Sequence, residues 1–137
     1  MNAVDTNVLV YAIDRHEPRK QTEAVSLLRQ LGPTDTVLLW QVAGEYLCCL
    51  RRFAAAGTFP DADVETEIVD LLRAFSLVLP TREVIQRSLS LSSRYSLSHW
   101  DSMLIAACLE AGVDTLYSED LDDGMTYQNV TVVNPFA

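Results

Sequence analysis

Cysteine is rare in this sequence and long hydrophobic runs are missing, and both absences limit the protein classes that fit. The three cysteines are the neighbours Cys48 and Cys49 and the distant Cys108, a spacing that suits neither a disulfide framework nor a zinc site. We therefore expect all three to be small buried hydrophobic residues. No apolar stretch reaches the roughly 18 residues of a membrane-spanning helix, and the N-terminal residues lack the pattern of a signal peptide. These features predict a soluble, cytoplasmic protein without a membrane partner.

Basic residues are also scarce. The 137 residues include 19 acidic and 10 basic side chains, a formal net charge of -9, and Lys20 is the only lysine. Because nucleic-acid-binding proteins usually present a basic surface, this balance argues against a polynucleotide ligand. The remaining basic residues are arginines, which bind phosphate well through their forked guanidinium groups. A carboxylate cluster that binds divalent cations would explain part of the imbalance, because the cations largely cancel its negative charge.

The length of the chain and the order of its predicted elements indicate one α/β domain over residues 1–137. A chain of 15.3 kDa is long enough to bury a core without disulfides. Runs of strand type end at Val4 or cover residues 36–40, 76–79, 115–117 and 130–133. Helical patterns separate them, including those at residues 18–31, 41–56 and 99–111. Strands that alternate with helices favour a parallel sheet with helices on both faces.

Two acids follow predicted strands. Asp5 comes directly after the strand that ends at Val4, and Asp120 lies just past the strand at 115–117. In α/β folds of this kind the site lies beyond the carboxyl ends of the strands, so both side chains should project to one edge of the sheet. Each acid also has an ordinary interpretation. Asp5 fits the N-cap of the helix that follows it, and Asp120 fits a solvated acidic turn.

Two further acids fall on helix faces that should be buried. Glu45 comes three residues after Val42 and four before Cys49, which places it on an apolar stripe. Asp101 likewise shares a face with Leu104. A lone buried carboxylate is unfavourable unless it is neutralised or paired, and no lysine lies near either acid. Each of these carboxylates therefore needs a positive partner.

A divalent cation would supply the missing positive charge. Mg²⁺ and Mn²⁺ prefer oxygen ligands and tolerate a carboxylate cluster that would otherwise repel itself. Taken alone, Asp101 fits the acid of a capping box that begins at Ser98, and Glu45 could point to solvent. One shared site accounts for all the acids at once. We therefore predict that divalent cations are bound together by Asp5, Glu45, Asp101 and Asp120.

Short motifs run through the chain in a characteristic order. They are Val4-Asp5-Thr6-Asn7-Val8-Leu9, the helix around Glu45, Trp100-Asp101 followed by Ala106-Ala107, and Ser118-Glu119-Asp120-Leu121 with Asn134-Pro135-Phe136. In order and spacing, from end to end, the sequence resembles the PIN-domain ribonucleases, particularly the VapC-type toxins of bacterial toxin-antitoxin pairs.

The resemblance implies a three-layer α/β/α sandwich with a central, mainly parallel sheet. It also implies a toxin that cleaves RNA with Mg²⁺ or Mn²⁺, forms a homodimer and is blocked by an antitoxin protein. The catalytic, metal-binding acids that it implies are Asp5, Glu45, Asp101 and Asp120. The supporting residues that it implies are Thr6, Ser118 and Asp123, and either Asp122 or Asp123 could take the place of Asp120.

These residues lead to a hypothesis of metal-dependent hydrolysis. A metal held by Asp5 and Asp101 would lower the pKa of a bound water, which attacks the scissile phosphorus in line. Glu45 and Asp120 would complete the ligand set or orient the water. A covalent mechanism is disfavoured, because no serine or cysteine forms a recognisable triad with the two histidines in the chain.

Three other functions would use some of the same features. A haloacid-type phosphatase would have an aspartate two residues after Asp5, where Asn7 stands, and a receiver domain would need a lysine late in the chain, where none follows Lys20. The third alternative is a catalytically silent PIN-fold module that only binds a protein partner. For such a module, Asp5→Asn should leave Mn²⁺ binding unchanged, whereas for the enzyme it should weaken Mn²⁺ binding.

Overall fold

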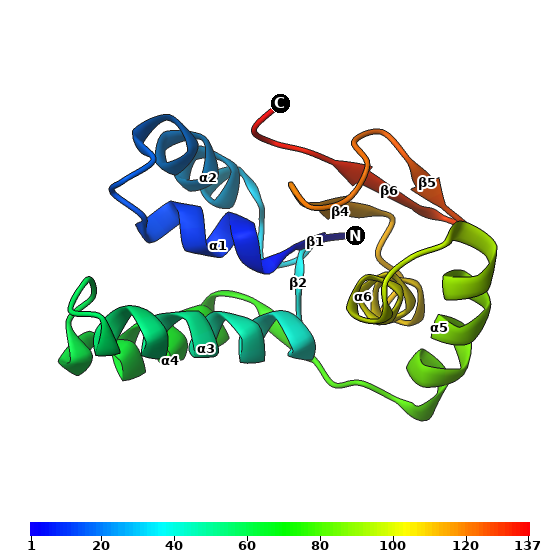
Figure 1. Cartoon of the computed structure of the whole chain (residues 1–137), viewed down its shortest axis with the longest axis horizontal. Coiled ribbons are helices and arrows are strands. Elements are labelled where there is room, and N and C mark those ends of the chain that lie inside the picture. Colours follow the sequence, from blue (N-terminus) through cyan, green and yellow to red (C-terminus); the bar gives the residue numbers. More distant parts are fainter.

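Six short strands lie at the centre of the molecule, and the computed structural model describes all of residues 1–137 (Figure 1). The strands are β1 (Asn2–Val4), β2 (Val37–Leu39), β3 (Ser76–Val78), β4 (Thr115–Tyr117), β5 (Thr126–Tyr127) and β6 (Val130–Val133). Strand β4 pairs in parallel with β1 and β6, β2 pairs in parallel with β3, and β5 runs antiparallel to β6. The sheet is therefore mainly parallel, as predicted.

Six α-helices surround the strands. They are α1 (Thr6–Ile13), α2 (Pro18–Gln30), α3 (Trp40–Ala55), α4 (Val64–Ala74), α5 (Arg82–Tyr95) and α6 (His99–Glu110), with a short 3-10 helix η1 (Asp61–Asp63) before α4. Helices α1 and α2 lie on one side of β1 and β4, and α5 and α6 lie on the other side (Figure 1). This arrangement confirms the predicted three-layer α/β/α sandwich. None of the helices combines the length and the apolar character needed to cross a membrane.

The order of the strands reverses at β1. The hydrogen-bonded orders are β1-β4-β6-β5 and β2-β3, and a parallel bridge between Asn2 and Thr36 joins the two groups. The chain therefore moves outward from β1 to β2 and β3, and then returns to place β4 on the other side of β1. In parallel α/β sheets such a reversal opens a crevice at the carboxyl ends of the strands. The first residues after β1 and β4, Asp5 and Ser118, lie at this position.

Proline and glycine stand at the helix boundaries where the sequence pattern predicts them. Pro18 is the first residue of α2, a position where its missing N–H removes no hydrogen bond. Gly57 and Gly112 follow α3 and α6 with φ angles of 77° and 74°. Glycine enters this left-handed region without strain, so both residues end their helices cleanly.

The β5–β6 hairpin was not predicted, because the sequence pattern indicates only an acidic turn between β4 and β6. Tyr127 pairs with Val130 across a two-residue turn, in which Gln128 has a φ of 55°. The backbone N–H of Gln128 donates to the hydroxyl of Tyr95, 3.0 Å away, which ties the turn to α5. A two-residue strand is too short to produce an alternating pattern of apolar residues.

The prediction for the cysteines was wrong for Cys48. All three cysteines are free, but Cys48 is exposed, Cys49 is partly buried and only Cys108 is buried. On α3 the buried stripe runs through Val42 and Tyr46, and adjacent helical residues point about 100° apart, so two neighbouring cysteines cannot both share it. Cys48 is the one that faces outward.

A single apolar core joins the strands to the helices. Ile105 on α6 and Leu116 on β4 are completely buried in it, whereas Leu72 on α4 is 43% exposed. We predict that Ile105→Ala lowers the free energy of unfolding by about 2 to 5 kcal/mol, because it removes buried methyl groups and leaves a cavity. Leu72→Ala should change it by less than about 1 kcal/mol. Urea unfolding followed by circular dichroism measures both, and equal losses would contradict this description of the core.

Candidate active site

The parallel pairing of β1 and β4 brings two polar residues together at the strand ends. Val4 pairs with Tyr117, so the next residues, Asp5 and Ser118, are neighbours. The backbone N–H of Asp5 donates to the carbonyl of Tyr117 at 2.8 Å, and the Ser118 hydroxyl donates to Oδ2 of Asp5 at 2.7 Å. Both side chains are buried. The predicted convergence of residues after β1 and β4 is therefore present.

Asp5 uses its two carboxylate oxygens differently. Oδ1 accepts a hydrogen bond from the backbone N–H of Thr6 at 2.7 Å, so Asp5 is the N-cap of α1. Oδ2 instead receives the Ser118 hydroxyl. The N-cap interpretation is confirmed, and it leaves the second oxygen to the group of polar side chains at the strand ends.

Glu45 reaches the same region from α3. The Thr6 hydroxyl donates to Oε2 of Glu45 at 2.7 Å, and the side-chain amide of Gln41 donates to Oε1 at 2.9 Å. Glu45 is partly buried, and its helical neighbours Val42 and Tyr46 are buried. Both oxygens are thus held by hydrogen bonds from within the chain, and the side chain does not turn away to solvent.

Asn7 links the strand-end acids, a function that the sequence interpretation did not assign to it. Its Nδ2 donates to Oδ2 of Asp120 at 3.1 Å and lies 3.5 Å from both Oδ2 of Asp5 and Oγ of Ser118. Its Oδ1 accepts the backbone N–H of Glu119 at 3.3 Å. Asn7 lies one residue into α1 after Thr6, and the only sequence signal was its place in the Asp5-Thr6-Asn7 motif.

Asp120 is the acid of the 118–124 loop that joins this network. Its backbone N–H donates to the Ser118 hydroxyl at 3.1 Å, while its carboxylate contacts Asn7. Asp123 accepts the backbone N–H of Asn134 at 2.8 Å, so its carboxylate supports the end of β6. Asp122 is exposed.

A lysine fixes the loop that carries Asp120. Lys20, the only lysine in the chain, forms an ion pair with Glu119 and also donates to the Tyr11 hydroxyl at 3.2 Å. Burial acts to raise the pKa of Glu119, but the contacts with Lys20 and the Tyr11 hydroxyl together outweigh it and hold this pKa below its usual value. The contact joins α2 to the residue directly before Asp120, and it was missed because these residues lie far apart along the chain.

Asp101 stands apart from the other three acids. It is the third residue of α6, and its backbone N–H donates to the hydroxyl of Ser98 at 3.3 Å, which is one half of the capping box that the sequence pattern allows. Its carboxylate is partly exposed and makes no hydrogen bond to the other acids. The structure thus joins Asp5, Glu45 and Asp120 through Thr6 and Asn7, and leaves Asp101 unconnected.

The environment of Asp5 makes its negative charge unfavourable. The pKa of Asp5 is raised to about 6, chiefly by burial and in addition by the nearby charges of Asp120 and Glu45, although the hydrogen bonds from Ser118 and Thr6 act to lower it. A cation at this position would lower the pKa again by favouring the ionised carboxylate.

The donor set suits a hard divalent cation, although the side chains do not form a finished metal site. No three aspartate, glutamate, histidine or cysteine side chains are grouped closely enough to hold an ion as they stand. Three oxygens, from Asp5, Ser118 and Asp120, nevertheless surround the single nitrogen Nδ2 of Asn7. This nitrogen carries a partial positive charge and lies between two carboxylates, so the oxygens around it are arranged about a positive group. Mg²⁺ and Mn²⁺ take oxygen ligands, and the residues present therefore fit either cation.

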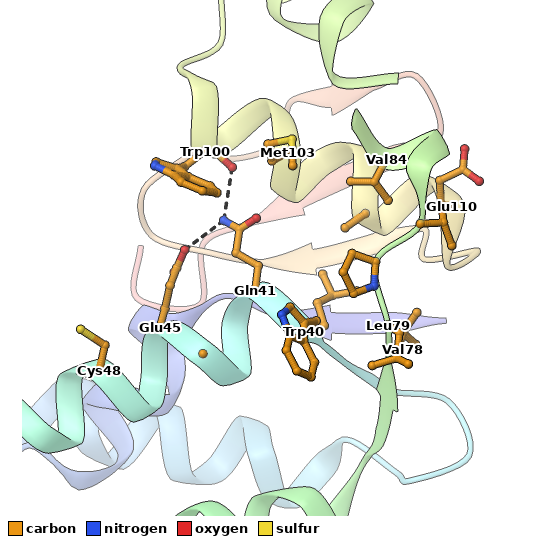
Figure 2. A pocket seen from close by; sticks show the side chains of 15 residues that line it. Trp40, Gln41, Glu45, Cys48, Val78, Leu79, Val84, Trp100, Met103 and Glu110 are labelled. Carbon is orange, nitrogen blue, oxygen red and sulfur yellow. Dashed lines mark hydrogen bonds between the residues drawn. The ribbon is translucent and has the colours of Figure 1, made fainter. Parts of the chain in front are cut away.

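A groove of about 570 Å³ opens next to Glu45 (Figure 2). Glu45 and Gln41 lie on its wall, together with Trp40 at the start of α3 and Trp100 at the start of α6. The Gln41 amide bridges the groove, because it contacts Glu45 and also the carbonyl of Trp100 at 3.4 Å.

Comparison with known proteins gives one family and several similar structures. A family model described as PIN domain matches residues 3–124. A toxin-antitoxin complex from Klebsiella pneumoniae has a TM-score of 0.73 at 18% sequence identity, with 98% of each chain covered. FitAcB from Neisseria gonorrhoeae has a TM-score of 0.70 at 15% identity, with 99% of each chain covered.

A third similar structure is VapC20 from Mycobacterium tuberculosis, described as a sarcin-ricin loop cleaving toxin. Its TM-score is 0.68 at 19% identity, over 88% of this chain and 90% of that chain. A search of the curated proteins found no match. At these identities the structural similarity establishes the fold.

The raised pKa of Asp5 predicts a pH-dependent stability in the absence of divalent cations. Below about pH 4 the carboxyl group is protonated in both the folded and the unfolded protein, so it does not change the free energy of unfolding. As the pH rises toward the folded-state pKa of about 6, the unfolded state ionises first, and the folded state loses stability relative to it. Full ionisation corresponds to a loss of roughly 3 kcal/mol.

Asp5→Asn should remove this loss, so the variant should be more stable than the wild type near neutral pH. Urea unfolding in EDTA at about pH 4.5 and about pH 7.5 measures the difference, which should widen at the higher pH by roughly 2 kcal/mol. An equal pH dependence in the two proteins would show that Asp5 ionises freely in the fold.

Proposed function

Since the chain belongs to the PIN-domain family, we propose that it is a metal-dependent endoribonuclease that hydrolyses RNA phosphodiester bonds. The observation that carries the proposal is the arrangement around Asp5. A buried carboxylate lies at the reversal of strand order, with Glu45 and Asp120 tied to it through Thr6 and Asn7. Carboxylates gathered at this edge of a parallel sheet suit cation-assisted phosphoryl chemistry.

The acids proposed to hold Mg²⁺ or Mn²⁺ are Asp5, Glu45, Asp101 and Asp120. When bound, the cation supplies Lewis-acid chemistry, since it activates water and neutralises charge on the phosphate. The protein residues keep the acids in place. Ser118 and the Thr6 backbone fix the Asp5 carboxylate, and the Thr6 hydroxyl and Gln41 fix Glu45.

Asn7 and the loop that follows β4 fix the fourth acid. The Asn7 amide holds the Asp120 carboxylate, and the ion pair of Lys20 with Glu119 anchors the neighbouring residue. The Asp101 carboxylate at the start of α6 accepts no hydrogen bond within the chain, so it is available as a cation ligand. Glu45 and Asp120 either add ligands or orient the attacking water, and no side chain needs to act as a nucleophile.

We further propose that the protein is the toxin of a bacterial toxin-antitoxin pair. Two structures support this assignment, namely the toxin-antitoxin complex from Klebsiella pneumoniae and the sarcin-ricin loop cleaving toxin from Mycobacterium tuberculosis. The partners are then an RNA substrate and a small antitoxin protein. The homodimer implied by the family resemblance stays a prediction. The exposed Ile85 and Leu89, one turn apart on α5, are the apolar residues with which to test it.

A catalytically silent protein-binding module is the second candidate. It is favoured by the separation of Asp101 from the other acids and by the absence of a finished metal site. Such a module would not cleave RNA with or without divalent cations. The enzyme would cleave RNA with Mg²⁺ or Mn²⁺ and stop in EDTA, so this comparison separates the two candidates.

Purified protein should cleave total RNA in the presence of Mg²⁺ or Mn²⁺ and lose this activity in EDTA. Asp101→Asn should lower the rate by about 100-fold or more, because it removes a proposed cation ligand without breaking a hydrogen bond of the fold. Asp61→Asn, which makes the same change of charge at an exposed residue of η1, is the matched control and should retain activity. Cleavage that persists in EDTA would refute the metal dependence.

A second pair of variants identifies the fourth acid. Asp120→Asn should reduce cleavage by about 10-fold or more, whereas Asp122→Asn should leave it nearly unchanged. Both residues are exposed, but the Asp120 carboxylate accepts a hydrogen bond from Asn7, which also lies next to Asp5, whereas Asp122 has no such contact. Initial rates on one RNA substrate measure both effects, and the reverse order would assign the fourth position to Asp122.

A further inference from the structure

Two exposed indoles lie on the wall of the groove beside the acids. Trp40 is 54% exposed and Trp100 is 62% exposed, and both line the 570 Å³ groove (Figure 2). In this view the Trp100 indole lies above the Gln41 side chain and the Trp40 indole lies below it. They are the only tryptophans in the chain. Large exposed aromatic rings are unfavourable in water, so their position calls for a ligand.

Each tryptophan directly precedes a residue of the proposed active site. Trp40 comes before Gln41, which donates to Glu45, and Trp100 comes before Asp101. The ring of His99 packs edge-on against Trp100, with ring centroids 4.5 Å apart and an interplanar angle of 72°, which restricts the orientation of the indole. The groove therefore reaches the acids at Glu45, which lies on its wall, and it carries ordered aromatic surface.

We propose that this groove is a nucleobase subsite, in which Trp40 and Trp100 stack on unpaired bases of the RNA next to the bond that is cleaved. The inference rests on the proposed function, because it assigns the groove to the substrate of that site. Single-stranded RNA presents bases that stack on aromatic side chains irrespective of sequence. A volume of about 570 Å³ also falls within the size of small-ligand sites.

The charge of the protein favours bases over phosphates as the main point of contact. With a formal net charge of -9, the chain repels the phosphate backbone as a whole. Stacking is not weakened by this repulsion, because every base offers an uncharged aromatic face. Glu110, which lines the groove, forms an ion pair with Arg87 at 2.8 Å, so this arginine is not free to bind a phosphate.

The polar part of the groove wall distinguishes a base from a second protein surface. The cores of protein interfaces are depleted of charged groups, whereas this groove contains the Glu45 carboxylate and the Gln41 amide. The Gln41 amide between the two indoles already donates to Glu45 and to the Trp100 carbonyl, so its oxygen remains to accept a hydrogen bond from the edge of a base that is stacked there.

Tryptophan fluorescence tests the proposal without cleavage. Both emitting residues lie in the groove, so a 10-nucleotide single-stranded RNA of mixed sequence, added in EDTA, should quench the wild-type emission. Trp40→Leu and Trp100→Leu should each raise the Kd for this RNA, labelled with fluorescein and followed by anisotropy, by about 10-fold. Trp40→Phe and Trp100→Phe keep an aromatic ring and should raise it by less than about 3-fold. Leu72→Ala on α4 is the control outside the groove.

Two further measurements separate base stacking from binding through the phosphates. An abasic oligonucleotide of the same length should bind the wild type no better than the RNA binds Trp40→Leu. The plot of log Kd against log salt concentration should have a slope below about 2, because few phosphates are contacted. A steep slope, or equal binding by the leucine variants and the wild type, would overturn the proposal.

The remaining outcomes distinguish this proposal from the nuclease proposal. Quenching by RNA with no cleavage in Mn²⁺ would refute the nuclease and retain the groove as an RNA site. Metal-dependent cleavage with an unchanged KM in both leucine variants would retain the nuclease and overturn the subsite. If the leucine variants dissociate a dimer, measured by light scattering, and bind RNA as the wild type does, the groove belongs to a second copy of the chain and the subsite is overturned.

Discussion

The ionised carboxylate of Asp5 sets the main constraint on this protein. It is buried where the order of the strands reverses, and its pKa is raised to about 6 by that burial. The position of Asp5 is fixed by the backbone, because Asp5 caps α1 and its backbone N–H donates to the carbonyl of Tyr117 at the end of β4. A negative charge held so rigidly in low dielectric requires positive charge nearby, and no lysine or arginine supplies it there.

The surrounding residues satisfy this constraint only in part. Ser118, Thr6 and Asn7 donate hydrogen bonds to the acids, which compensates for lost hydration but adds no net charge. The cationic group of Lys20 is instead paired with Glu119, beside the acids. The result is a set of carboxylates ordered by neutral donors, which is the condition under which a divalent cation binds well to oxygen ligands.

The sequence was enough to predict the fold and the grouping of three of the four acids, for different physical reasons. Asp5 and Asp120 follow strands whose parallel pairing brings their ends together, and Glu45 sits on a face that must be buried. Asn7 and the Lys20–Glu119 pair were not found, since they depend on contacts between segments about a hundred residues apart that leave no local pattern. The β5–β6 hairpin was missed because its strands are too short, and Cys48 was placed on the wrong face of α3.

Equilibrium binding of Mn²⁺, measured by isothermal titration calorimetry, is the most direct test of whether the distant acids form one cation site. The wild type and Asp122→Asn should bind Mn²⁺ equally, and Asp5→Asn and Asp101→Asn should each bind it at least about 10-fold more weakly. Equal binding by all four proteins would contradict a shared site and would leave Asp5 as the cap of α1 alone.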